Sequence, residues 1–351
     1  MYCENLIDFL KKIKIENDEL HQFNKRINQY HFNDDVIENM RMMRDNYYSS
    51  DGFSKKNFQK EYIENLEIAE WLLGIYDIAF AHNHKDANPR FHKHRYFYRG
   101  LSKSEYKLVS GIYRSNEKEE NFYFRELLVR CPEKLSNLKN FNKLTYMQHY
   151  GSPTRLLDIT SNPLVALYFA CEKNKKQDGI VYVLGVNPDE IAYETSDRVQ
   201  MLSHLQELSG KDQHQLLMLS YINLLKDKFP QTTNSKYKDI ELERFFYSIQ
   251  KENAVFQREI IPLDLLRPVF VQANQNNRRI LKQDGAFIMS GLDIDERDSH
   301  KKICKHVVKE ITIPYFAKDG ILKDLELVGI HKASLFPELE TVSEYLKEKL
   351  T

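Results

Sequence analysis

The chain has 351 residues, 42% of them hydrophobic, which is enough to bury the core of one large or two modest domains. Its 51 basic and 51 acidic residues cancel, so no whole-molecule field favours nucleic acid or a membrane surface. Only 12 glycines are present, and neither GxGxxG nor GxxxxGKS/T occurs, which argues against a fold built on a glycine-rich phosphate loop.

Cysteine usage and the N-terminus favour a reduced, cytoplasmic protein. The four cysteines never fall in a CxxC spacing, so we expect free thiols and neither a metal site nor a disulfide framework. The N-terminus carries Glu4 and several lysines among its apolar residues, unlike a secretory signal peptide. No apolar run approaches the roughly 20 residues that a membrane-spanning helix needs. We therefore expect no membrane segment.

Residues 1–92 are predicted to form a helical N-terminal segment. The stretch Phe58–Ala81 has apolar residues at helical spacing and contains the single tryptophan, Trp71. A loose histidine cluster follows, but it lacks cysteines and helical HxxxH spacing, so we interpret it as a solvated loop rather than a metal site. The cluster consists of His82, His84, His92 and His94.

Residues 93–345 are predicted to form an α+β domain around a small mixed sheet. The helical pattern of about residues 195–255 predicts a helical insertion within this domain. Short runs rich in β-branched and aromatic residues predict the strands. These strands are Tyr96–Arg99, Thr154–Ile159, Ile180–Val186, Leu266–Val271 and Ala286–Met289.

The stretch Tyr146–Ala170, YMQHYGSPTRLLDITSNPLVALYFA, organises the domain. Its pattern predicts a loop, a short strand, and then a buried helix with Pro163 as first residue and Asn162 or Ser161 as cap. Arg155, Asp158 and Thr160 would lie at this strand-to-helix junction, where backbone N–H groups favour an anion. The structural alternative is that Arg155 and Asp158 form a buried ion pair that fixes the junction.

Three separated pieces resemble the FRG domain, a family named for its aromatic-Arg-Gly motif and widespread in bacteria. The first is Tyr98-Arg99-Gly100, followed by Tyr113-Arg114. The second is QHYGSPTRLLDITSNPLVALYFA, and the third is Gln283–Phe287 with the closing run Leu335–Leu339. The resemblance covers about residues 93–345, and some members of the family lie in loci that look like phage defence.

A more distant resemblance, to ADP-ribosyltransferases of the Arg-Ser-Glu type, suggests the chemistry. Those enzymes also have an aromatic-Arg-Gly strand, then a strand with hydroxyl residues, an A-x-x-F-A helix, and a last strand before a Gly-turn-Phe. Where their pattern places a catalytic glutamate, this chain has Arg279. The resemblance therefore implies that another acid supports the positive charge that develops at the ribose, with Asp158 and then Glu126 as candidates.

The resemblance implies a site that binds NAD as substrate. Asp158, Glu126 and Thr160 are the predicted catalytic residues, and forked arginines suit the pyrophosphate. The predicted binding residues are Tyr98, Arg99, Gly100, Arg114, His149, Arg155, Arg279 and Gln283.

Three functions remain open at this point. The first is ADP-ribosyl transfer or NAD cleavage, as in a phage-defence or toxin effector, with a protein or a nucleic acid as acceptor. The second is a non-catalytic module that senses a nucleotide or nucleic-acid end. The third is a nuclease-like effector, with His149, Arg155 and Asp158 as acid, base and anion clamp.

Overall fold

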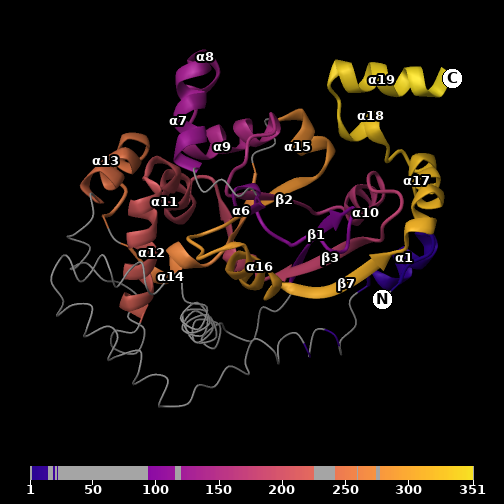
Figure 1. Cartoon of the computed structure of the whole chain (residues 1–351), viewed down its shortest axis with the longest axis horizontal. Helices are drawn as coiled ribbons and strands as arrows, with labels where there is room; N and C mark the ends of the chain where they lie inside the picture. Colours follow the sequence, from indigo (N-terminus) through magenta and orange to yellow (C-terminus); the bar gives the residue numbers. More distant parts are fainter. Residues whose placement is uncertain are drawn as a thin grey trace.

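The computed structural model describes residues 2–14, 19, 22, 94–114, 120–224, 242–258, 260–273 and 277–350. These residues form a seven-stranded mixed sheet with helices on both faces, in the strand order β4-β5-β6-β2-β1-β3-β7 (Figure 1). The α+β class and the mixed sheet predicted from the sequence are confirmed.

Every neighbouring pair of strands is antiparallel except β4 and β5. β1 and β2 are joined through the single register pair Tyr98↔Thr160, whereas β1 and β3 pair over their full length. The sheet therefore splits where β1 and β2 diverge. The strands are β1 Arg95–Leu101, β2 Leu156–Thr160, β3 Gly179–Val186, β4 Ile191–Tyr193, β5 Val269–Gln272, β6 Gly285–Met289 and β7 Val307–Ile313.

Four of the five predicted strand segments coincide with β1, β2, β3 and β6 to within two residues. The fifth, Leu266–Val271, begins too early, because Pro262–Leu266 forms the short helix α14 and the strand begins only at Val269. A proline followed by leucines suits a first helical turn as well as a strand. The three-residue strand β4 was not predicted.

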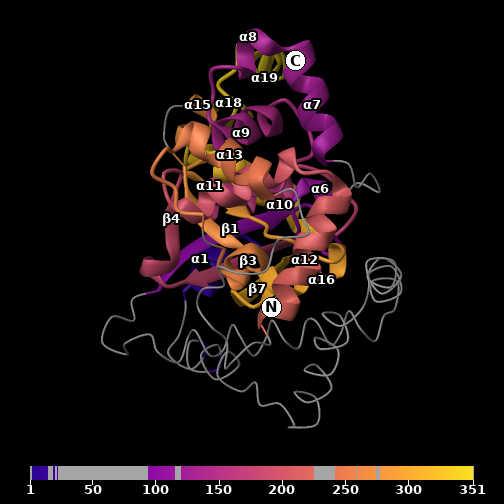
Figure 2. The same cartoon turned by 90° about the vertical axis from the view of Figure 1, so that its left-hand side faces the viewer.

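Most helices cover the sheet, and a few stand at its upper edge (Figures 1 and 2). Short 3-10 turns, η2 Pro188–Glu190, η3 Leu205–Glu207 and η4 Tyr315–Ala317, connect some of them. The helices named below are α1 Leu6–Lys12, α6 Gly111–Arg114, α7 Glu120–Arg130, α8 Pro132–Leu135, α9 Asn140–His149, α10 Pro163–Cys171, α11 Asp197–His204, α12 Gly210–Leu224, α13 Leu242–Glu252, α15 Arg278–Lys282, α16 Glu296–Cys304, α17 Lys318–Leu327, α18 Lys332–Leu335 and α19 Leu339–Leu350.

One face of the β1-β3-β7 side packs against α10, α17 and α1. Val165 and Leu167 of α10 share a buried cluster with Val181 of β3 and Ile311 of β7. α10 begins as predicted: Pro163 is its first residue, and the side chain of Asn162 accepts a hydrogen bond from the backbone N–H of Leu164. This cap fixes the direction in which α10 leaves the junction at the end of β2.

The other end of the sheet is covered by α9 and by the helices between residues 197 and 266. Leu202 and Leu216 of these helices share one buried cluster with Phe287 of β6 and Val271 of β5. Residues 225–241 of the predicted helical insertion lie outside the described residues. So do Phe58–Ala81 and His82, His84 and His92. His94 directly precedes β1.

No helix in the described part of the chain is long and apolar enough to cross a membrane. The four cysteines, all among the described residues, are unpaired.

Candidate functional site

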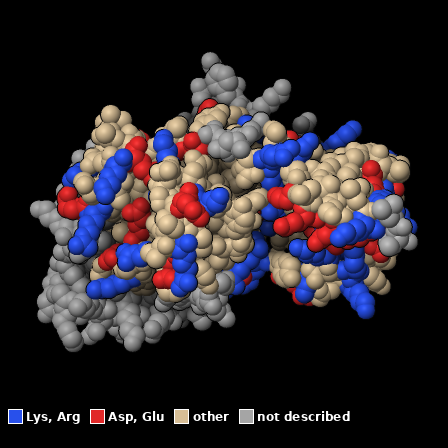
Figure 3. Space-filling view, turned by 90° about the horizontal axis from the view of Figure 1, so that it is seen from above, with Lys and Arg blue, Asp and Glu red and all other residues tan. Residues whose placement is uncertain are grey.

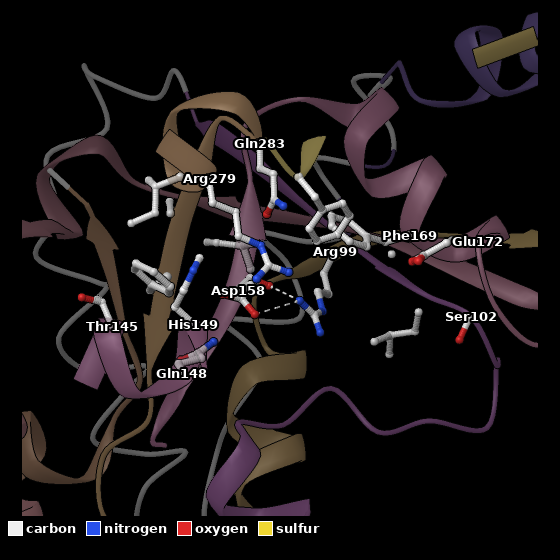
Figure 4. Close-up of a pocket in the computed structure, with 18 of the residues that line it drawn as sticks. Arg99, Ser102, Thr145, Gln148, His149, Asp158, Phe169, Glu172, Arg279 and Gln283 are labelled. Atoms are coloured by element: carbon white, nitrogen blue, oxygen red, sulfur yellow. Dashed lines mark hydrogen bonds and ion pairs between the residues drawn. The ribbon is translucent and has the colours of Figure 1, made fainter. Parts of the chain in front are cut away.

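A cavity of about 530 Å³ lies where β1 and β2 separate (Figure 4). β1, β2 and β6 supply its floor, α9 and α15 one wall, and α10 with α18 the other. Viewed from above, a hollow separates two lobes of the molecule, and Lys and Arg side chains lie in it (Figure 3). Five lining side chains are cationic and two are acidic: Arg99, Arg114, Lys173, Arg279 and Lys332 against Asp158 and Glu172.

Arg99 and Asp158 meet across the split in the sheet. The Arg99 guanidinium donates a hydrogen bond of 2.8 Å to the backbone oxygen of Asp158 and lies 3.7 Å from its carboxylate (Figure 4). Asp158 occupies the one exposed position of β2, whose other four residues are buried. Its side chain is 57% exposed, so the carboxylate faces the cavity rather than the core.

The Arg99 guanidinium is incompletely neutralised. Its Nε is buried and has no hydrogen-bond partner. Burial lowers the pKa of Arg99 to about 10, Asp158 opposes that shift, and the nearby positive charge of Arg114 adds to it. A desolvated guanidinium with one partial counter-charge gains from an anionic ligand.

Arg114 provides a second cation close to Arg99. It lies in the last turn of α6, where its Nε and Nη2 both donate to the carbonyl oxygen of Val109, at 3.1 and 2.7 Å. Burial also lowers its pKa. Held at this carbonyl, Arg114 lines the main cavity and a neighbouring cavity of about 460 Å³, as does Asp158.

Gln148 and His149 end α9 at the cavity wall. Gly151 follows with φ +86°, a left-handed conformation typical of the residue after a helix. The Thr154 hydroxyl donates to Gln148 Oε1 at 2.8 Å, which fixes the Gln148 amide. His149 Nε2 lies 3.6 Å from Glu338 Oε1. Burial lowers the pKa of His149, and Arg279 lowers it further, while Glu338 opposes both.

Arg279 and Gln283 enter the cavity from α15, a helix that was not predicted. The Arg279 guanidinium lies 4.4 Å from the ring centroid of Phe336, and Gln283 Nε2 donates to the Leu335 carbonyl oxygen at 3.1 Å. Both contacts join α15 to the segment around α18. The closing run Leu335–Leu339 therefore forms part of the cavity wall.

Arg155 does not line this cavity. It is 1% exposed, and its guanidinium forms a buried ion pair with Glu120 of α7. It also donates to the carbonyl oxygens of Ser290 and Gly291, at 3.3 and 3.4 Å. The alternative of an Arg155–Asp158 ion pair is therefore wrong, because each residue has a different partner. Arg155 comes just before β2, and its side chain turns into the core.

Three further predicted residues lie away from the cavity, and one borders it through its backbone. Glu126 pairs with Arg130 on α7, outside the cavity. The Thr160 hydroxyl is buried and donates to the Gln283 carbonyl oxygen at 2.6 Å. Tyr98 packs against the α10 cluster. Gly100 lines the cavity, and a Cβ there would lie 1.8 Å from the carbonyl oxygen of Ala166.

Sequence reasoning missed Glu172, Lys173, Phe169 and Lys332 as lining residues. Phe169 lies in α10, the helix of the central motif, and Glu172 directly follows that helix, so both could have been inferred from the motif; the end of α10 faces the cavity (Figure 4). No sequence pattern around Lys332 indicated that it would line the cavity. Among the described residues, no group of three or more His, Cys, Asp or Glu is placed to hold a metal ion.

Residues 94–179 match the family model of the FRG domain. Residues 94–179 therefore carry an FRG domain, and the resemblance is confirmed for its first two pieces, whereas the third piece lies beyond the matched residues. The matched residues contain β1, β2 and α10, the elements that place Arg99 and Asp158. No curated protein and no solved structure gives a significant match.

Proposed function

We propose that the cavity binds NAD or a related dinucleotide and that the protein cleaves its nicotinamide bond, as a transferase or a glycohydrolase. The observation that carries this proposal is the Arg99–Asp158 pair at the split of the sheet. It puts a partly buried cation and an exposed carboxylate side by side on the cavity floor.

The charge of the cavity suits a pyrophosphate. Arg99 is partly buried on the cavity floor, Arg114 lies beside it, and Arg279 approaches from the α15 wall, so phosphate oxygens between them would meet forked donors from two sides. A volume of about 530 Å³ falls within the range of small-molecule sites. Gln148, Gln283 and the ring of Phe336 add polar and flat apolar surfaces.

Asp158 is our choice for the acid that supports bond cleavage. Breaking the bond to nicotinamide develops positive charge on the ribose, which a nearby carboxylate stabilises. Asp158 is the acid of the predicted set that faces the cavity, whereas Glu126 lies on a different surface. The glutamate position of the enzymes that the sequence resembles is taken by Arg279, which can hold a phosphate but cannot stabilise that charge.

A second candidate is a nucleotide-sensing module without catalysis. The observation that favours it is the cation excess, five against two, since this arrangement holds an anion whether or not a bond breaks. The nuclease alternative loses support, because Arg155 is buried with Glu120 and not beside His149 and Asp158.

One experiment separates these candidates. Wild-type protein is titrated with NAD by calorimetry and then incubated with NAD, alone and with protein, RNA or DNA, while free nicotinamide is followed. We expect wild-type protein to bind NAD and to release nicotinamide. Arg99→Ala should weaken NAD binding, whereas Asp158→Asn should slow nicotinamide release without weakening NAD binding. Binding without release from any mixture supports the sensing module. If the protein neither binds NAD nor releases nicotinamide, both candidate functions are rejected.

A further inference from the structure

A further cavity, of about 570 Å³, adjoins the main one and is distinct from the neighbouring cavity of about 460 Å³ described above. We call it the second cavity. The two share Thr145, His149, Asn277 and Arg279, so His149 stands at their junction. The second cavity also holds Glu338, whose carboxylate faces His149. A ligand in the main cavity and a reactant in the second would therefore meet beside this histidine.

We propose that His149 is the general base that activates an oxygen nucleophile entering through the second cavity, and that Glu338 positions its ring. This assignment rests on the proposed function, because it names the second reactant of the same reaction. A hydroxyl or water needs such a base, since it loses a proton as it attacks.

The step balances as follows. The oxygen of the acceptor forms a bond to the anomeric carbon of the nicotinamide ribose, and the bond from that carbon to the ring nitrogen breaks. The electron pair goes to nicotinamide, which leaves neutral, and the acceptor's proton goes to His149. The positive charge thus passes from the pyridinium to the imidazolium, next to the Glu338 carboxylate. Nε2 is the ring nitrogen beside Glu338, so Nδ1 takes the proton.

The surroundings of His149 suit this role. Burial and Arg279 of α15 lower its pKa, so the ring is neutral, and able to accept a proton, at pH 7. Tyr150, the residue that follows His149 at the end of α9, packs edge-on at 4.9 Å between ring centroids, which limits rotation of the His149 ring. Across the main cavity, Asp158 points toward the same space (Figure 4).

The charges of the second cavity narrow the acceptor class. Arg278 and Arg279 line it, and Glu338 is the acid that opposes them. A lysine or arginine acceptor would be repelled by these two guanidiniums. A neutral or anionic acceptor that attacks through oxygen fits better.

The test follows nicotinamide release and acceptor choice together, with methanol as the probe alcohol. Wild-type protein with NAD and methanol should give methyl ADP-riboside beside ADP-ribose. His149→Asn should lower both products by about 10²–10⁴-fold while NAD affinity stays within about threefold. If His149→Asn releases nicotinamide as fast as wild type, the assignment of His149 is wrong. It is also wrong if wild-type protein binds NAD but cleaves it with neither water nor methanol. Absence of NAD binding would reject the proposed function itself.

The pH profile supplies the readout for Glu338. Release requires neutral His149, so the rate falls as the pH drops through its pKa. Because Glu338 raises that pKa, Glu338→Gln should move this acidic limb to lower pH. The matched control is Glu340→Gln, two residues further on, at an exposed position that lines neither cavity. If the acidic limb of the pH profile lies at the same pH in Glu338→Gln and in wild type, Glu338 does not position His149.

The second cavity is tested by narrowing it. Asn142 lines that cavity and not the main one. Asn142→Trp should slow release while NAD affinity, measured by calorimetry, is unchanged. Equal release rates in Asn142→Trp and wild type would show that the acceptor enters elsewhere.

Discussion

Arg155 and Glu120 illustrate how a motif residue can serve the fold rather than the ligand. Their ion pair is buried, and loss of one partner leaves the other charge without compensation in the core. Arg155→Ala should therefore lower the free energy of unfolding by about 3–5 kcal/mol. Arg130→Ala, which removes an exposed pair with Glu126, should change it by about 1 kcal/mol or less. Urea denaturation of both variants measures the difference, and equal stabilities would refute the structural role of Arg155.

Asp158 is the opposite case, because its carboxylate faces the cavity. Asp158→Asn keeps the side-chain shape and removes the charge, so nicotinamide release should fall by about 10²–10³-fold. The melting temperature should stay close to that of wild type, since the side chain is more than half exposed. A variant that keeps wild-type release would mean that another acid, such as Glu172, supports the reaction.

At the scale of elements, α10 lies against β1 at Gly100. A Cβ there would overlap the backbone of Ala166, so Gly100→Ala should push α10 off the sheet and move Arg99 with it. We expect a large loss of stability, readable as a lower melting temperature. Gly320→Ala in α17 is the matched control, because nothing lies within 4 Å of its Cβ position. Alanine in a helix is favoured over glycine by up to about 1 kcal/mol, so this control should be neutral or stabilising. Two variants of equal stability would contradict the close packing of α10.

Local patterns predicted the elements that local chemistry determines. The β-branched run of β3 and the Asn162-Pro163 start of α10 predicted a strand and a helix that the structure contains. α15 could not be predicted, because five residues after an Asn cap carry too little periodicity. The strand Leu266–Val271 was misplaced for a related reason: apolar runs of this length suit either a strand or a helical turn.

The residues of the site were predicted less well than the elements, because side-chain direction depends on tertiary partners. Arg155 and Asp158 are three residues apart, yet one pairs with α7 and the other with β1. A threonine hydroxyl such as that of Thr160 suits a ribose contact, but this hydroxyl instead donates a hydrogen bond to the Gln283 carbonyl oxygen. Lys332 reaches the cavity from a segment more than 150 positions beyond the central motif, and no local pattern reports such an approach.

For the molecule as a whole, burial predicts how the thiols react. Burial raises the pKa of Cys3 to about 11 and the pKa values of Cys171 and Cys304 to about 12, so these three are poor nucleophiles in the folded protein. Cys131 is exposed at the start of α8. A colorimetric thiol reagent at pH 8 should therefore modify one cysteine rapidly in native protein and all four after unfolding. Fast reaction of a second thiol in native protein would contradict the packing of α10, α16 or the N-terminal segment.

The structure of the protein crystallised with ADP-ribose tests the central claim most directly. We predict that the pyrophosphate lies between Arg99 and Arg279, and that the ribose carbon that carried nicotinamide lies within reach of Asp158 and His149. A ligand bound on another surface, or no ligand at concentrations that saturate known dinucleotide sites, would contradict the assignment of this cavity.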